Sequence, residues 1–344
     1  MKKKFDFSTL LRKFLMYIVL IVLLIAFQVI CKSATGRDFL SLSNVMNILG
    51  QNAYLLITGV GITFIMLGGA MDLSTGYLLS TIGIIMALID TASGSFVLAM
   101  GLGIICSVVI SGFNGVMYAW LRVFPFIITL ATQYILNGAT YLLSGGVQKT
   151  YKGLSDAFKV IGGANIPFLA GSSIKSGVIV MVILVIIGAL ILNKTHFGRN
   201  VYALGSNPDA VALSGVSVAK MRIAIFALAG LFFAFAQIVN IGKIGSASQS
   251  MGLGAEFTAM AGAMLGGIKM GGGGGKINNM VVGTLIIAVL NQGFNFMNVN
   301  QYWQKVALGI VLLFAVAIDE MQTRATINAA KKVSGKAPAQ NQAA

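Results

Sequence analysis

The polar residues that interrupt the long apolar runs of this chain are the side chains best suited to bind a solute. In the segment Leu67-Gly-Gly-Ala-Met-Asp-Leu-Ser-Thr-Gly76, an acid and two hydroxyls stand among glycines between two apolar runs. Discontinuous membrane helices of this kind supply free backbone groups near transport sites. The alternative is a plain turn in which Asp72 or Ser74 caps the following helix. Gly69, Asp72 and Ser74 are therefore candidate residues of a solute path.

Side-chain amides recur within two other apolar runs. Gln133 and Asn137 stand four residues apart and share a helix face, as do Asn291 and Asn295. Gln292 lies beside the second pair. Such groups are costly against lipid, so they face the protein interior, where they either join helices by hydrogen bonds or line a path for a neutral polyhydroxylated solute.

Acidic residues are scarce in the apolar runs. Asp90, Glu256, Asp319 and Glu320 fall at the ends of predicted spans, which leaves Asp72 as the acid expected to be partly buried. A pump or ion-coupled carrier keeps several ionisable groups inside the membrane to hold its ions. Proton coupling is therefore disfavoured.

Metal, disulfide and nucleotide chemistry find no support in the sequence. Cys31 and Cys106 have no paired spacing and no neighbouring ligands, and His196 is interpreted as a loop residue. The glycine run 271–276 ends in a lysine, but it lacks two residues that the P-loop pattern requires and no strand precedes it. We expect a turn at the membrane surface there. A membrane enzyme is disfavoured because no cluster of His, Cys or paired acids is present.

The elements that position these residues are membrane helices. Hydrophobic residues make up 57% of the 344 residues and charged residues 10%, with a mean hydropathy of +0.89, which excludes an ordinary soluble domain. Apolar runs long enough to cross about 30 Å of hydrocarbon recur without period-2 alternation. The sequence therefore predicts an all-α polytopic membrane protein, in contact with lipid, with about ten spans. They cover residues 14–31, 52–69, 76–93, 97–119, 124–144, 176–193, 221–242, 256–270, 279–297 and 303–319. The run 256–270 is short and glycine-rich, which is typical of a broken or re-entrant element.

Lysine and arginine positions give the orientation. With the N-terminus inside, twice as many Lys and Arg residues lie on the inner side as on the outer side, so the positive-inside rule predicts that both termini are cytoplasmic. The net charge of +15 is spread over loops and tails and forms no nucleic-acid patch. We expect a cytoplasmic tail at 1–13, a membrane domain at 14–322, and a cytoplasmic tail at 323–344 with the composition of a disordered end.

The segment 204–215 predicts a short capped helix between two spans, on the cytoplasmic side. Asn207 is a favourable N-cap, Pro208 suits the first helical position, and Asp209 lies at the positive end of the helix dipole. Gly215 ends the helix. Such a helix is either an ordinary connector or a docking element for a cytoplasmic partner.

Four motifs carry a family resemblance. The segment Asn207-Pro-Asp-Ala-Val-Ala-Leu-Ser-Gly215, together with Gly69-Ala-Met-Asp-Leu-Ser-Thr-Gly76, Pro125-Phe-Ile-Ile-Thr-Leu130 and Asn298-Val-Asn-Gln-Tyr-Trp303, resembles the permease subunits of bacterial ABC importers for simple sugars such as ribose and galactose, which are branched-chain-like permeases. The resemblance covers about residues 40 to 320.

The resemblance implies a type II ABC importer permease in the bacterial cytoplasmic membrane. It implies a second permease subunit, identical or a paralogue, two ATP-binding subunits that use ATP-Mg, and an extracytoplasmic sugar-binding protein; this chain itself would bind no cofactor. The capped helix would be the coupling helix, lying in a groove of the ATPase. Its docking residues would be Asn207, Pro208, Asp209, Ala210, Val211, Leu213, Ser214 and Gly215.

One departure from the family pattern affects the substrate. These permeases often carry Tyr-Glu-Leu-Asp-Ala where this chain has Ala255-Glu-Phe-Thr-Ala259, so the tyrosine and the second acid are missing. Nucleosides or signalling furanoses are therefore alternative cargoes, and pairing with a different permease chain is an alternative assembly. A stand-alone carrier or facilitator for a neutral solute, with the capped helix as a connector, is the alternative outside the family.

Overall fold

Eight helices among the described residues are long and apolar enough to cross a membrane. The computed structural model describes residues 7–121, 123–167, 172–311, 313, 314, 316 and 317. The eight helices are α1 (Phe7–Thr35), α2 (Leu42–Leu67), α3 (Thr75–Ser93), α4 (Phe96–Leu121), α5 (Pro125–Leu143), α7 (Ser176–Lys194), α10 (Val218–Ile244) and α12 (Ile277–Phe296).

Shorter elements connect these helices. They are α6 (Asp156–Gly162), α8 (His196–Ser206), α9 (Pro208–Leu213), α11 (Ala255–Leu265), β1 (Thr150–Lys152), β2 (Asn165–Pro167), β3 (Ser173–Lys175) and β4 (Ser246–Ser248). β1 pairs antiparallel with β4, with Tyr151 opposite Ala247, and β2 pairs antiparallel with β3, with Ile166 opposite Ile174. The strands only tie connecting segments together, so the all-α prediction is confirmed.

Two of the ten expected spans, both near the C-terminus, are not among these eight helices. The run 256–270 forms the 11-residue helix α11, which is about 16 Å long and covers about half of the hydrocarbon thickness. The run 303–319 is helical over its described residues up to 317, and its last two residues lie outside them. Residues 7–13 of the expected N-terminal tail form the start of α1, so the helix begins before the expected boundary at residue 14. Residues 1–6 and the expected tail at 323–344 lie outside the described residues.

Helix α2 begins ten residues before the span that hydropathy predicts. Ser41 caps it, because its hydroxyl accepts a hydrogen bond from the backbone N–H of Asn44. Polar residues fill the first turns and lower the hydropathy there; Asn44, for example, is buried and donates to the carbonyl of Phe39. Capping thus extends the helix where the apolar signal is weak.

Helices α10 and α4 form the most extensive helix–helix contact among the described elements. The hydroxyls of Ser107 and Ser111 on α4 donate to the carbonyls of Gly230 and Phe226 on α10 at 2.6 and 2.7 Å. A Cβ on Gly230 would meet the Ser107 carbonyl oxygen at 2.7 Å, so only glycine allows this approach. Small residues and hydroxyls at the contact are how membrane helices pack closely without a hydrophobic driving force between them.

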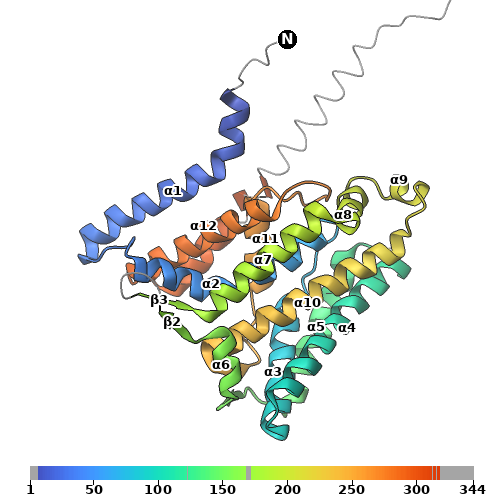
Figure 1. The fold of residues 1–344 in the computed structure, drawn as a ribbon, viewed down its shortest axis with the longest axis horizontal. Coiled ribbons are helices and arrows are strands. Elements are labelled where there is room, and N and C mark those ends of the chain that lie inside the picture. Colours follow the sequence, from blue (N-terminus) through green and yellow to red (C-terminus); the bar gives the residue numbers. More distant parts are fainter. Residues whose placement is uncertain (1–6, 122, 168–171, 312, 315, 318–344) are drawn as a thin grey trace, which may run out of the picture.

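The two ends of the bundle carry different elements. Helices α8 and α9 lie at one end, and α6 with β2 and β3 lies at the other, with α10 running between them (Figure 1). Helix α1 packs on α12 at the edge of the bundle, and only 11% of its apolar window is buried. Most of its surface is therefore free to face lipid.

Candidate functional site

Helix α9 has the capped geometry that the sequence predicts. The side chain of Asn207 accepts a hydrogen bond from the backbone N–H of Ala210 at 3.0 Å, Pro208 takes the first position, and Gly215 has a φ of +83° just beyond the helix. Val211 is buried, whereas Leu213 is 90% exposed. One apolar residue thus fixes the helix to the protein, and the other faces outward where a partner can cover it.

The remaining residues of the predicted coupling segment are also exposed. Pro208, Asp209, Ala210 and Ser214 lie on the surface at the end of the bundle. The hydroxyl of Ser214 donates to the carbonyl of Val211 and helps to close the last turn. The segment is therefore a locally rigid, exposed element, as a docking helix requires.

Helix α8 holds α9 against the membrane helices, and the sequence reading did not identify it. It runs from His196 to Ser206 and leads directly into α9. Its Gly205 lies so close to α2 that a Cβ there would meet the carbonyl oxygen of Leu67 at 1.9 Å and the backbone nitrogen of Gly273 at 2.5 Å. These contacts are backbone to backbone, so α8 packs directly on the end of α2 with no side chain between them.

The glycine run 271–276 completes this contact. Gly273 N–H donates to the carbonyl of Leu67 at 2.9 Å, and a Cβ on Gly272 would meet the Cα atoms of Gly205 and Gly69 at 2.8 Å. The hydroxyl of Tyr202 on α8 donates to the Gly275 carbonyl at 3.0 Å. Burial raises the pKa of Tyr202 above its ordinary value, at which the phenol is already protonated at neutral pH, so the hydroxyl is available as a donor. The glycines thus provide close backbone packing between α8, the α2–α3 turn and the segment before α12.

A groove opens beside α9. It has a volume of about 580 Å³, and its three walls are the end of α4 with the turn into α5, helix α9, and the start of α10. Tyr118, Phe124 and Pro125 form the first wall, and Arg222 of α10 stacks on Tyr118 with its guanidinium carbon 4.0 Å from the ring centroid. The sequence reading did not foresee this groove, because its walls come from three separate parts of the chain.

Asp72 lies at the end of a chain of buried hydrogen bonds. Its Oδ1 accepts from the backbone N–H and the hydroxyl of Ser74 at 2.8 and 2.5 Å. Ser74 in turn accepts from the Asn114 amide at 2.9 Å, and Asn114 accepts from the Thr132 hydroxyl at 2.6 Å. The network joins α3, α4 and α5. Oδ2 of Asp72 has no partner among the described residues, so one carboxylate oxygen is free to accept a hydrogen bond.

Two further acids are buried, which corrects the expectation that the acids at span ends leave Asp72 as the one to be buried. Glu256 and Asp90 are 2% and 4% exposed, against 0% for Asp72. Glu256 is buried because the segment before α11 turns back against α3: Gly252 N–H donates to the Ser80 hydroxyl at 3.0 Å. Asp90 is buried because it accepts hydrogen bonds from Ser155 across the opposite end of the bundle.

Among the described residues, Glu256 is one of three buried side chains with an unpartnered polar atom that the sequence analysis did not name as site residues. Its Oε2 has no partner within the described chain, and the same holds for Oε1 of Gln237 and for both amide atoms of Asn240. Gln237 and Asn240 share one face of α10. Glu256 was recognised only as a match to the family motif, and no local pattern separates these two amides from others in the spans.

The amides predicted on α5 and α12 lie on different parts of the bundle. Helix α5 packs on α3 and α4, whereas α12 packs mainly on α1, α2 and α11. On α5, Gln133 and Asn137 are half-buried, and Oε1 of Gln133 is unpartnered within the described chain. Gln133 is next to Thr132 in the sequence and so lies close to the Asp72 network, which the α12 amides do not join.

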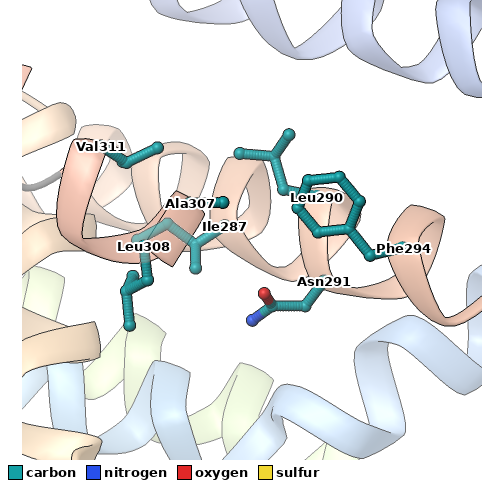
Figure 2. A pocket seen from close by; sticks show the side chains of 7 residues that line it. All are labelled: Ile287, Leu290, Asn291, Phe294, Ala307, Leu308 and Val311. Carbon is teal, nitrogen blue, oxygen red and sulfur yellow. The ribbon is translucent and has the colours of Figure 1, made fainter. Parts of the chain in front are cut away.

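The α12 amides join helices. Gln292 donates to the Asn44 side chain on α2 at 2.8 Å, and Asn295 accepts from Gln304 at 2.8 Å. Figure 2 shows the Asn291 side chain with its apolar neighbours on α12 and the following helix, around a cavity of about 10 Å³. That volume holds about one water molecule, so no larger solute fits beside Asn291 in this conformation.

Comparison with known proteins identifies relatives of this chain. Residues 44–316 match the family described as the branched-chain amino acid transport system / permease component. The chain is 33% identical over 336 residues to the galactose/methyl galactoside import permease protein of Escherichia coli (strain K12), covering 93% of this chain and 97% of that protein. No solved structure matches.

Two more relatives carry other sugars in their names. The ribose import permease protein of Bacillus subtilis (strain 168) is 33% identical over 322 residues, which cover 94% of this chain and 97% of that protein. The fructose import permease protein of Rhizobium meliloti is 34% identical over 309 residues, which cover 88% and 84%. The identities are nearly equal, so they do not favour one sugar over another.

Proposed function

Because this chain belongs to the branched-chain amino acid transport system permease component family, we propose that it is the membrane subunit of an ATP-driven importer that carries a simple sugar into the cell. The family and the relatives are permeases, so the chain is a multi-pass transporter subunit and not an enzyme. The observation that carries the proposal is the exposed, capped helix α9 in a chain similar over more than nine-tenths of its length to sugar import permeases.

In this proposal the end of the bundle with α8 and α9 faces the cytoplasm, and both termini are cytoplasmic. The helix ends and connecting segments there carry Lys194, Arg199, Lys220, Lys269 and Lys276, in keeping with the positive-inside rule. The membrane domain extends over 14–322, between tails at 1–13 and 323–344. The membrane is the bacterial cytoplasmic membrane.

Helix α9 is the coupling helix, and residues 207–215 enter a groove of the ATP-binding subunit. ATP-Mg is held and hydrolysed by that subunit, and this chain binds no cofactor. Closure of the ATPase pair pushes on α9; the backbone contacts of Gly205 with Leu67 and Gly273 carry the movement to the end of α2 and to the segment before α12. The helices then reorient, and the path opens first to one side of the membrane and then to the other.

The sugar path includes Gly69, Asp72, Ser74, Gln133 and Asn137. The unpartnered Oδ2 of Asp72 and Oε1 of Gln133 accept hydrogen bonds from sugar hydroxyls, because buried acceptors gain free energy when a donor reaches them. We retain Asn291, Gln292 and Asn295 as path residues of a conformation in which α12 has moved away from its present partners. Uptake by single alanine variants tests the two groups of path residues separately: a group lines the path if its variants lose uptake while the chain still inserts.

The second permease subunit, a copy of this chain or a paralogue, packs against α5. Among the described elements, α5 makes extensive contacts only with α3 and α4. Its uncovered surface includes Tyr134, 70% exposed, beside the half-buried Gln133 and Asn137. Amides are costly against lipid, so a protein neighbour is favoured there. An extracytoplasmic binding protein delivers the sugar to the opposite end from α9.

The substrate proposed first is a monosaccharide of the ribose, galactose or fructose kind, since the three relatives are named for these sugars. The missing tyrosine and second acid around Glu256 keep nucleosides and signalling furanoses as alternatives. The test is uptake of labelled galactose, ribose, fructose and a nucleoside by a strain that expresses the complete importer. Uptake of none of the sugars would overturn the sugar assignment.

The coupling role is tested by purification of the tagged chain in mild detergent and identification of the proteins that accompany it. We expect an ATP-binding subunit. The variant Ala210→Glu places a carboxylate in the ATPase groove and should abolish both uptake and copurification, while the chain still inserts. A chain that is always recovered alone, or normal uptake by Ala210→Glu, would favour a stand-alone carrier.

A further inference from the structure

The groove beside α9 contains a charge, that of Arg222, for which the structure gives no ion-pair partner among the described residues. Arg222 lines it, and although its guanidinium stacks on Tyr118, its Nε has no hydrogen-bond partner among the described residues. A buried donor of a charged group that lacks an acceptor costs free energy. An occupant of the groove that brings a carboxylate oxygen to the other nitrogens of this guanidinium would compensate its charge, and a planar guanidinium is well suited to such a pair.

The opposite wall of the groove is apolar. Phe124 is 80% exposed at the turn between α4 and α5, and Pro125 lies beside it. On the third wall are Asp209 and Ala212 of α9. An apolar side chain of the occupant would therefore cover Phe124. A protein segment can supply a carboxylate for Arg222 and an apolar side chain for Phe124 together, and since α9 forms the third wall, a segment of the partner that docks on α9 is favoured over an anionic lipid headgroup.

We propose that this groove receives a segment of the ATP-binding subunit in which a carboxylate pairs with Arg222 and an apolar side chain packs on Phe124. The inference rests on the proposed function, because α9 forms both one wall of the groove and the proposed coupling helix. The two subunits then hold each other reciprocally: α9 enters the ATPase, and a segment of the ATPase enters the groove between α9 and the α4–α5 turn. The ATPase can in this way pull on α9 as well as push it.

The test measures the affinity of the purified ATP-binding subunit for the permease in nanodiscs. Arg222→Gln removes the charge and should weaken binding by about tenfold or more, because a desolvated charge pair is lost. Phe124→Ser should weaken it as well, and since Phe124 is exposed its replacement leaves the fold intact. Lys220→Gln is the matched control: it removes an exposed charge at the start of the same helix, outside the groove, and should have little effect.

The outcomes separate this inference from the proposed function. If Ala210→Glu abolishes binding while Arg222→Gln and Phe124→Ser bind as the parent does, the groove proposal is overturned and the coupling role stands. If Ala210→Glu also binds normally, the coupling role itself fails. If Arg222→Gln weakens binding only in nanodiscs with anionic phosphatidylglycerol, and not in neutral phosphatidylcholine, the groove holds a lipid headgroup and the proposal is wrong.

A crosslink locates the occupant directly. A photoactivatable thiol reagent on Ala119→Cys, in the wall beside Tyr118, should label a segment of the ATP-binding subunit that contains Asp or Glu. The parent chain, with its own Cys31 and Cys106, controls for labelling elsewhere. Labelling of the C-terminal residues of this chain instead would show that the groove is filled from within and would overturn the proposal.

Discussion

Gly205 gives the sharpest test of the contact that joins the coupling helix to the membrane helices. In Gly205→Ala, the new Cβ would lie 1.9 Å from the carbonyl oxygen of Leu67, 2.5 Å from the backbone nitrogen of Gly273 and 3.0 Å from the Cα of Gly272. All three atoms belong to the backbone, so no side chain can rotate away. The helix must separate from its neighbours by about 1 Å in a tightly packed contact.

Two effects of opposite sign determine the size of the change. Overpacking costs about 1–3 kcal/mol and sometimes more, and contact with three backbone atoms places this site at the upper end. Alanine in place of glycine within a helix returns about 1 kcal/mol. We therefore expect a net loss of about 2 kcal/mol of stability and a fall of a few degrees in Tm.

The assay is thermal unfolding of the purified chain in detergent, together with uptake in cells. The matched control is Gly101→Ala on α4, where a Cβ would meet nothing within 4 Å. The control should keep or slightly raise the Tm and leave uptake unchanged. In Gly205→Ala, uptake should fall further than the amount of inserted protein, because the movement of α9 is no longer transmitted to α2.

A Gly205→Ala protein as stable as Gly101→Ala and with full uptake would refute this reasoning. It would show that α8 does not pack on Leu67 and Gly273 as the structure has it. Reduced stability with unchanged uptake per inserted molecule would leave the packing correct and reject the role of the contact in coupling.

Three other substitutions test separate parts of the structure. Asn207→Ala removes the cap on α9, which costs about 1 kcal/mol locally; uptake should fall while Asn207→Ser, which caps equally well, retains it, and equal uptake by both would contradict the role of the cap. Asp72→Ala should lower the Tm because the Ser74 N–H loses its acceptor, whereas Asp72→Asn keeps an acceptor and should lower uptake far more than Tm; normal uptake by Asp72→Asn would reject the path role. Gln249→Ala should destabilise the chain by about 2–3 kcal/mol in the same unfolding assay, because the Gln249 amide donates to Ser144 and Val147 and accepts from the Lys149 N–H; an unchanged Tm would show that these bonds are absent.

Local sequence patterns predicted the spans because the hydrophobic signal of a membrane helix is contained within one segment. The predicted run 176–193 became α7 (Ser176–Lys194), and 76–93 became α3 (Thr75–Ser93). The start of α2 was missed by ten residues, since a hydroxyl cap and polar first turns give no apolar signal there. Helix α8 was missed for a related reason: it is short and lies outside the spans.

The features of the candidate site also separate into those set by local sequence and those set by contacts between distant residues. The sequence by itself determined α9, because the Asn207 cap, Pro208 and Gly215 act within a few residues of one another. Only the tertiary structure decided that Glu256 is buried, that the glycine run packs against Gly205, and that a groove with Arg222 lies beside α9. Each of these features depends on contacts between residues far apart in the chain, and the close approach of backbones that creates them leaves no periodic trace in the sequence.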